Sequence, residues 1–145
     1  MNTNQIGDIG EAIAIAEFTK AGAIVSKPLS DNARYDLIIE LNNKLYKVQV
    51  KTTQSSDKNT KMIFATKTTN YTKGHWKSTA YESGEVDLFF LYCLENNWFG
   101  LWNVTNLKEI KSSLTLRFCL PKTGQKSNIN LIKDYDFTHV IASLA

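Results

Sequence analysis

The chain has 145 residues, of which 43% are hydrophobic and 11% aromatic, and it carries a formal net charge of +3. This length and composition predict a single domain, residues 1–145, whose core needs no metal or disulfide to hold it together. The polar N-terminus and the short apolar runs are not those of a signal peptide or a membrane span. We therefore expect a cytoplasmic protein with no membrane partner.

The order of the expected elements indicates an α/β protein. A helix is expected over 6–21, because this stretch is rich in Ala, Ile and Glu and ends at Gly22. Strands are expected at 23–27, 34–41, 44–53, 61–66, 86–94, 98–104 and 114–120. Residues 67–84 read as irregular, Asn106 and Glu109 as a capping box for one or two helical turns, and 134–145 as holding a short terminal helix. Together these elements predict a mixed sheet flanked by helices.

Two cysteines, Cys93 and Cys119, each lie in an apolar run typical of a strand. We expect both to be buried free thiols, with a disulfide or metal pair as the minor alternative.

The strands at 34–41 and 44–53 are predicted to form a hairpin through the turn Asn42-Asn43, because Asn tolerates the positive φ of a two-residue turn. This register places Asp36 opposite Gln49. Alternation sends one set of residues to an apolar face, namely Leu37, Ile39, Leu41, Tyr46, Val48 and Val50. The polar face receives Arg34, Asp36, Lys47, Gln49 and Lys51. A polar hairpin face is often merely solvated, so the convergence alone does not establish a site.

Glu11, on the predicted first helix, is a further polar residue that we expect to face the protein interior. It shares a helical face with Ile15 and Phe18, which we expect to point into the core. An inward-facing carboxylate needs a cation or a hydrogen-bond network. One interpretation is a structural ion pair with Lys51 or Arg34, and the other is a role in a site.

Glu11 on the first helix, Asp36 on one strand and Gln49-Val50-Lys51 on the next resemble the motif of the PD-(D/E)xK nuclease superfamily. The resemblance covers residues 5–53 most directly. Two later stretches, YESGEVDLFFLYC and KDYDF, further resemble the small homing endonucleases encoded by bacterial group I introns. The motif departs from the family pattern at Tyr35, where Pro is common, and at Gln49, where a carboxylate is usual.

The resemblance implies a restriction-endonuclease-like αβββ core followed by further strands and short helices. It also implies Mg²⁺-dependent, site-specific hydrolysis of double-stranded DNA, with Mn²⁺ able to substitute. The catalytic residues carried over by the motif are Glu11, Asp36, Gln49 and Lys51. The implied metal ligands are Asp36, the Val50 carbonyl and Glu11.

The lysines are concentrated in one segment of the chain. Residues 41–81 hold eight lysines and one acid, a net charge of +7 that leaves −4 for the rest. This uneven distribution of charge suits binding to a polyanion, although a solvated basic face is the simpler alternative. Aromatic residues interleave with the lysines over 53–82, which we expect to contact DNA. The predicted contacts are Arg34, Lys47, Lys58, Lys61, Lys73, His75 and Lys77.

Each chain holds one such site, so cutting both strands of a duplex calls for two subunits, and we expect a homo-oligomer, a dimer or a tetramer. The apolar strands at 86–94 and 98–104 could join that interface, although burial in the core is the expected fate of most of their residues. Four alternatives stay open from sequence: a Holliday-junction resolvase, a repair or restriction nuclease of the same fold, a DNA-binding protein whose nuclease site has decayed at Gln49, and a small basic scaffold unrelated to nucleic acid.

Overall fold

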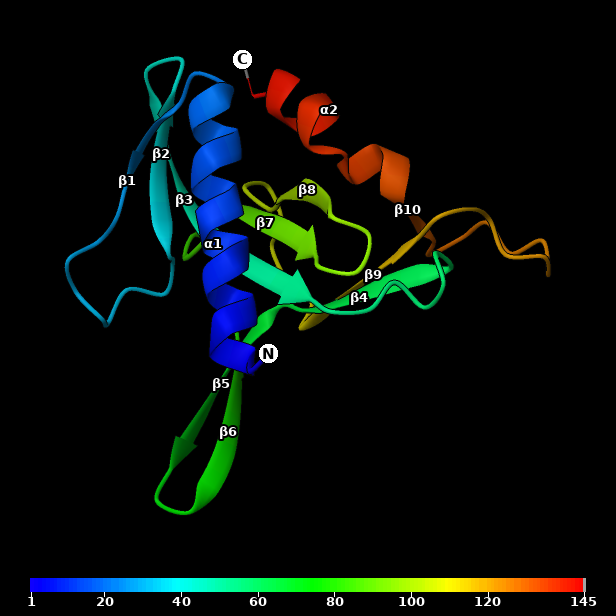
Figure 1. The fold of residues 1–145 in the computed structure, drawn as a ribbon, viewed down its shortest axis with the longest axis horizontal. Helices are drawn as coiled ribbons and strands as arrows, with labels where there is room; N and C mark the ends of the chain where they lie inside the picture. The colour runs from blue at the N-terminus through cyan, green and yellow to red at the C-terminus, as the bar shows by residue number, and fades with distance from the viewer. Residues whose placement is uncertain (145) are drawn as a thin grey trace.

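The computed structural model describes residues 1–144 and contains two α-helices, one short 3₁₀ helix and ten strands within that range (Figure 1). The elements in chain order are α1 (Thr3–Lys20), β1 (Ile24–Ser26), β2 (Leu37–Leu41), β3 (Lys44–Thr53), β4 (Lys61–Ala65), β5 (Lys67–Thr72), β6 (His75–Ala80), β7 (Leu88–Cys93), β8 (Trp98–Asn103), β9 (Ser113–Arg117), β10 (Asn130–Leu131), η1 (Ile132–Tyr135) and α2 (Phe137–Ala142).

The strands form three sheets. The largest has the order β1-β2-β3-β7-β8 and is mixed, because β3 and β7 run parallel while its other neighbours are antiparallel. A second sheet has the order β10-β9-β4, and β5 pairs only with β6. The α/β fold with a mixed sheet and flanking helices is therefore confirmed.

Helix α1 begins earlier than predicted because its N-terminus is capped. The Asn2 side chain accepts a hydrogen bond from the Gln5 backbone, and the Gln5 side chain accepts one from the Asn2 backbone, which forms a capping box. The helix packs on β3, and its buried residues Gly10, Ala14 and Phe18 face the sheet. Glu11, next to Gly10, is thereby carried to the edge of this packed surface.

The β2–β3 hairpin has the predicted register. Leu41 pairs with Lys44 and Leu37 with Val48. Asn42 and Asn43 have φ values of 52° and 62°, as a tight two-residue turn requires. Leu37, Ile39, Val48 and Val50 are buried on one face, so the predicted sorting of apolar and polar residues is confirmed.

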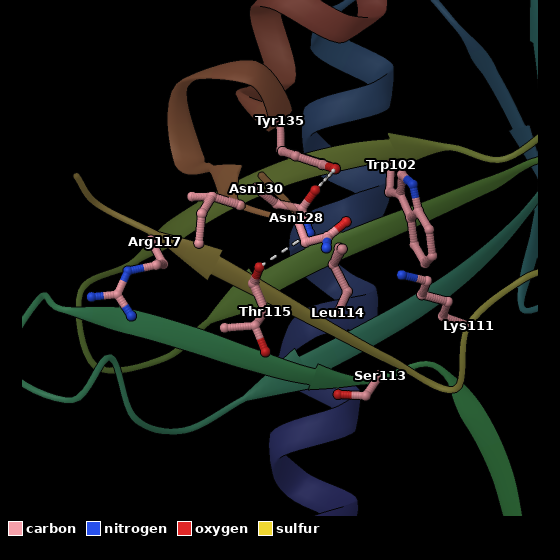
Figure 2. Close-up of a pocket in the computed structure, with 10 residues that line it drawn as sticks. Trp102, Lys111, Ser113, Leu114, Thr115, Arg117, Asn128, Asn130 and Tyr135 are labelled. Carbon is pink, nitrogen blue, oxygen red and sulfur yellow. Dashed lines mark hydrogen bonds between the residues drawn. The ribbon is translucent and has the colours of Figure 1, made fainter. Parts of the chain in front are cut away.

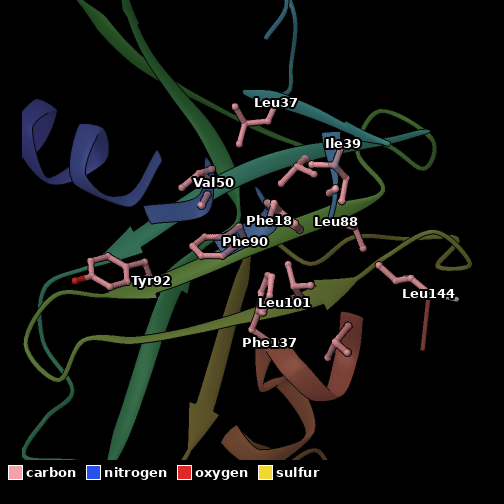
Figure 3. Packing of buried hydrophobic residues seen from close by; sticks show 14 residues of the cluster. Phe18, Leu37, Ile39, Val50, Leu88, Phe90, Tyr92, Leu101, Phe137 and Leu144 are labelled. Atoms are coloured by element: carbon pink, nitrogen blue, oxygen red, sulfur yellow. The ribbon is translucent and has the colours of Figure 1, made fainter. Parts of the chain in front are cut away.

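Two apolar clusters cover the two faces of the large sheet. The first gathers α1, α2 and one face of the sheet around Phe18, Phe90 and Phe137 (Figure 3). The second lies between the other face and the β4–β9 sheet and includes Phe64 and Phe89. All six residues of β7 are buried, since this strand contributes to both clusters. It is a core strand, as expected of most of this apolar stretch.

Three predictions from the sequence were wrong. Residues 67–80 are a regular hairpin, β5–β6, and not an irregular segment. Asn106 and Glu109 do not begin a helix; a turn forms there and Glu109 bridges to Glu82. Cys119 is an exposed free thiol, because β9 ends at Arg117, whereas Cys93 is buried and free as predicted.

Within residues 1–144, no helix combines the length and apolarity that crossing a membrane requires.

Candidate active site

Asp36 lies at the point where the pairing of β2 with β3 ends. Its backbone N–H donates to the Val48 carbonyl at 2.9 Å, and its carboxylate accepts the Val50 N–H at 2.9 Å. Because the β2–β3 pairing ends at Leu37 and Val48, no β2 residue pairs with Val50, and its N–H bonds to the Asp36 side chain on that side. Burial raises the pKa of Asp36 above its ordinary value of 3.8, and the Val50 hydrogen bond opposes that rise.

Lys51 brings an ammonium group to the same place. Its Nζ donates to the Lys67 carbonyl at 2.9 Å and lies 5.5 Å from the centre of the Tyr81 ring. Burial lowers the pKa of Lys51 below 10.5, while the nearby Asp36 carboxylate favours the charged form. A half-buried carboxylate and a half-buried amine on the same polar face are thus close enough for each to influence the pKa of the other.

Asp36 borders a hollow on the surface. Asp36 and Gln49 line it together with residues from the preceding loop, the β5 strand and Tyr81. The additional lining residues are Asp31, Asn32, Ala33, Arg34, Thr68, Asn70 and Tyr81. The predicted convergence of the two hairpin strands therefore produces a concave polar surface and not a flat solvated one.

Glu11 has a partner that the sequence did not indicate. Its carboxylate forms an ion pair with Lys27, and not with Lys51 or Arg34. Glu11 nonetheless belongs to the electrostatic environment of Asp36, because its negative charge adds to the rise in the pKa of Asp36. The hydrogen bond and charge of Glu11 raise the pKa of Lys27. No spacing rule singles out Lys27, since the loop after β1 places it.

Arg34 is partly buried against the base of the β5–β6 hairpin. Its guanidinium pairs with Glu85 at 2.5 Å and lies 4.4 Å from the Tyr81 ring centre. It also donates to Thr68 Oγ1 at 3.1 Å and to two carbonyls at the end of β6, those of Thr79 and Ala80, at 3.3 and 3.2 Å. These bonds fasten the hairpin to the segment just before β2, which carries Asp36.

The other predicted DNA contacts fall into three places. The Lys47 ammonium donates to the Gly84 carbonyl, beside the site. Lys58 is in a left-handed turn and Lys61 begins β4, so both belong to the second sheet. Lys73, His75 and Lys77 are on the β5–β6 hairpin, which projects away from the body of the protein (Figure 1). The basic segment is therefore divided among the large sheet, the second sheet with the turn before β4, and the β5–β6 hairpin.

The donor set suits a small oxygen-preferring cation. Among the described residues, no three His, Cys, Asp or Glu side chains gather in a metal-binding cluster. Mg²⁺ commonly uses only one or two carboxylates, with water and substrate oxygens completing an octahedron. Asp36, the Val50 carbonyl and Glu11 fit such a sparse set, and they do not fit a structural zinc site.

A second polar cavity, of about 450 Å³, lies beside β9 and contains none of the predicted catalytic residues (Figure 2). Asn130 links its walls by donating to the Thr115 carbonyl and accepting from the Tyr135 hydroxyl. The buried Nε of Arg117, on its rim, has no hydrogen-bond partner within residues 1–144. The Asp36 hollow is the candidate active site because motif residues Asp36 and Gln49 line it, and not because of its volume.

Comparison with known proteins agrees with this geometry. Curated proteins give no match to the chain. Among solved structures, the chain is similar to a bacterial homing endonuclease, I-Ssp6803I, with 26% identity and a TM-score of 0.74 over 99% of this chain and 95% of that one. The model of the PD-(D/E)XK endonuclease family matches residues 1–138. Enzymes of this family generally use divalent metals. The chain therefore belongs to the PD-(D/E)XK endonuclease family.

Proposed function

We propose that this protein is a Mg²⁺-dependent endonuclease that hydrolyses double-stranded DNA at specific sites, in the manner of an intron-encoded homing enzyme. The observation that carries the proposal is the Asp36 carboxylate, bonded to the Val50 N–H and within electrostatic reach of the Lys51 ammonium, at the base of a basic hairpin. Family membership and the similarity to a homing endonuclease support the same activity.

The catalytic roles follow from the chemistry of each group. Asp36 and the Val50 carbonyl would hold the cation, and Glu11 would complete its ligands directly or through water. A bound divalent cation supplies Lewis-acid charge and lowers the pKa of coordinated water. Exchange of Lys27 for the cation would free Glu11 for this task, since Lys27 now neutralises it.

Lys51 is proposed to orient the attacking water and to offset the negative charge that develops on the phosphate. Its lowered pKa brings the amine closer to the range in which it can exchange a proton with that water. Gln49 lines the hollow with an amide in place of a carboxylate, so it would orient water or phosphate by hydrogen bonds without adding negative charge.

DNA binding is proposed to involve several parts of the basic segment. Lys73, His75 and Lys77 on the hairpin and Lys58 and Lys61 near the second sheet would contact the duplex. Arg34 lies at the base of the β5–β6 hairpin and Lys47 is bonded to the Gly84 carbonyl beside the site, so their charge adds to the same field. One site per chain also leads us to propose a homo-oligomer, a dimer or a tetramer, because two strands must be cut.

The deciding experiment is cleavage of duplex DNA that contains the insertion point of the gene's own intron, in Mg²⁺, in Mn²⁺ and in EDTA. Wild-type protein is expected to cut in both metals and not in EDTA. Asp36→Ala and Lys51→Met should abolish cutting while a gel-shift assay shows that binding persists. Lys108→Met, at an exposed lysine outside the basic segment, serves as the matched control and should cut normally.

Other outcomes identify the alternatives. Cleavage of four-way junctions of any sequence, in preference to linear duplex, would indicate a resolvase. Tight binding without cutting in either metal would indicate that Gln49 marks a decayed site. Light scattering of the purified protein tests the oligomer: a monomer both free and bound to DNA contradicts that part of the proposal. Cytoplasmic location and intron encoding stay predictions.

A further inference from the structure

The β5–β6 hairpin is an exposed two-stranded ribbon without a core of its own. Every residue of β6 is exposed, and Lys73-Gly74 turns the chain with φ values of 52° and 79°. Between 67 and 80 there are three lysines and a histidine, and no acidic residue. Six residues per strand give the ribbon a length of about 20 Å. An isolated hairpin of this kind is only marginally stable in water. Its exposed, extended shape suits contact with a partner outside the folded body.

The register gives the ribbon two different faces. Tyr71 pairs with Trp76, and Asn70 pairs with Lys77. Since side chains alternate along a strand, these two pairs point to opposite sides. The Tyr71 and Trp76 rings are 5.1 Å apart, centre to centre. The face that bears them also carries Thr69 and Ser78, whose hydroxyls are 3.2 Å apart.

The other face is continuous with the catalytic hollow. Thr68 and Asn70, two residues apart on β5, line the hollow together with Asp36 and Gln49. Lys77 lies directly across from Asn70 and therefore shares that side. A duplex whose phosphate is placed at Asp36 would meet Asn70 and Lys77, while Tyr71 and Trp76 face away from it.

We propose that Asn70 and Lys77 are specificity-determining residues that read base edges in the major groove close to the cut phosphate. This inference rests on the proposed function and adds to it the residues that select the sequence. A two-stranded ribbon fits the major groove, which is about 12 Å wide. Asn pairs well with adenine N6 and N7, and Lys with guanine O6 and N7. Directly opposed residues are about 5 Å apart, so the two would read the same or adjacent base pairs.

The test compares the sequences that each variant selects from a library of randomised duplex DNA. Binding is scored in the Lys51→Met background, and cleavage is scored in the otherwise wild-type protein. Asn70→Ala and Lys77→Met should each reduce discrimination at one or two base pairs by about tenfold, the low to middle part of the range for one specific pair. Thr69→Ala and Ser78→Ala, on the opposite face, are the matched controls and should keep the wild-type profile.

Separate results tell the two proposals apart. Wild-type protein that selects a sequence, with an unchanged profile in both Asn70→Ala and Lys77→Met, overturns the inference and leaves the nuclease proposal intact. Wild-type binding with no sequence preference also overturns the inference, because nothing is then read. Failure of the wild-type protein to cut in Mg²⁺ or Mn²⁺ counts against the nuclease, while altered binding profiles would still support the reading face. Because the hairpin is exposed, these substitutions should leave the protein folded, and circular dichroism checks this.

Discussion

The Lys51 ammonium donates a hydrogen bond to the backbone carbonyl of Lys67, the first residue of the β5–β6 hairpin, at 2.9 Å. The candidate catalytic amine is thus bonded to the base of the proposed DNA-contacting arm. Arg34 reinforces the same junction from the β2 side through Thr68, Thr79 and Ala80. The position of the hairpin and the environment of Lys51 are therefore set by shared contacts.

Loss of Arg34 should loosen the hairpin before it unfolds the protein. Arg34→Met removes the ion pair with Glu85 and three hydrogen bonds to the hairpin base. Charged hydrogen bonds of this kind contribute about 1.5–3 kcal/mol each, so amide exchange across 67–80 should accelerate by at least about tenfold. Hydrogen exchange by mass spectrometry measures this. Arg34→Lys keeps the charge but not the several N–H donors of the guanidinium, so its exchange rate should be intermediate. Unchanged exchange in Arg34→Met would show that Arg34 does not hold the hairpin in place.

A side chain at position 10 should destabilise the protein, because it would clash with the Cγ2 methyl group of Thr52. A Cβ at this position would lie 2.1 Å from Thr52 Cγ2, so Gly10→Ala must displace either the Thr52 side chain or α1. We expect the free energy of unfolding to fall by about 1–3 kcal/mol, as for other overpacked cores. Where α1 is displaced, metal affinity should fall as well, because Glu11 moves with the helix.

Thr52→Ser supplies the control for that clash, since it removes Cγ2 and leaves the next Thr52 atom 3.6 Å away. Gly10→Ala/Thr52→Ser should regain most of the lost stability relative to Thr52→Ser alone. Urea denaturation of the four proteins measures the coupling. Additive losses would show that the Thr52 methyl is not the obstacle.

Asp36 should lower stability at neutral pH in the metal-free protein. Its pKa is raised in the folded state, so the folded state holds a proton more tightly than the unfolded one. Stability is then highest when Asp36 is protonated and declines as pH rises from 3.8 through the raised folded value. Asp36→Asn should therefore be more stable than wild type near pH 7 in EDTA, with the difference shrinking as pH falls. A difference that stays constant across that range would contradict the raised pKa.

The same shift predicts how activity depends on pH. Protonated Asp36 cannot hold a cation, so cleavage should be lost on acidification at a pH above the range of an ordinary aspartate. Added Mg²⁺ favours the ionised form and should move the loss to lower pH. Cleavage rates measured against pH at two Mg²⁺ concentrations test this, and a midpoint that does not move with Mg²⁺ would exclude Asp36 as the titrating ligand.

Lys27 should compete with a divalent cation for Glu11. Removing the ammonium with Lys27→Met leaves the carboxylates of Glu11 and Asp36 without that positive neighbour. Because the pair is partly exposed, the gain should be modest, about two- to fivefold in Mn²⁺ affinity by calorimetry. Lys20→Met is a matched control on α1, where Lys20 pairs with Glu17 at 3.0 Å. Equal affinities in the two variants would show that Lys27 does not compete.

The catalytic hairpin was predictable because two independent signals agreed. Asn42-Asn43 fixed the turn, and a period of two sorted Leu37 and Ile39 from the polar positions. The same reasoning failed for β5–β6, whose strands are mostly polar and show no sustained alternation. Its one local signal was Lys73-Gly74, a pair suited to a tight turn with positive φ.

The remaining errors have causes in tertiary structure. Lys27 reaches Glu11 only because the loop after β1 returns toward α1, which no local pattern encodes. The sequence around Asn106 suits a helix cap, but Leu107 donates to the Val104 carbonyl and closes a turn there. Cys119 lies in an apolar run, yet the strand pairing of β9 ends two residues before it.

The parallel pairing of β3 with β7 joins residues 48–53 to residues 88–93. A peptide ending at Thr53 would carry every motif residue and still lack the strand that seals the far edge of β3. During synthesis on the ribosome, the β2–β3 hairpin therefore lacks its neighbouring strand until some forty further residues have emerged. An early truncation product would be catalytically inert and prone to self-association through the open edge of β3.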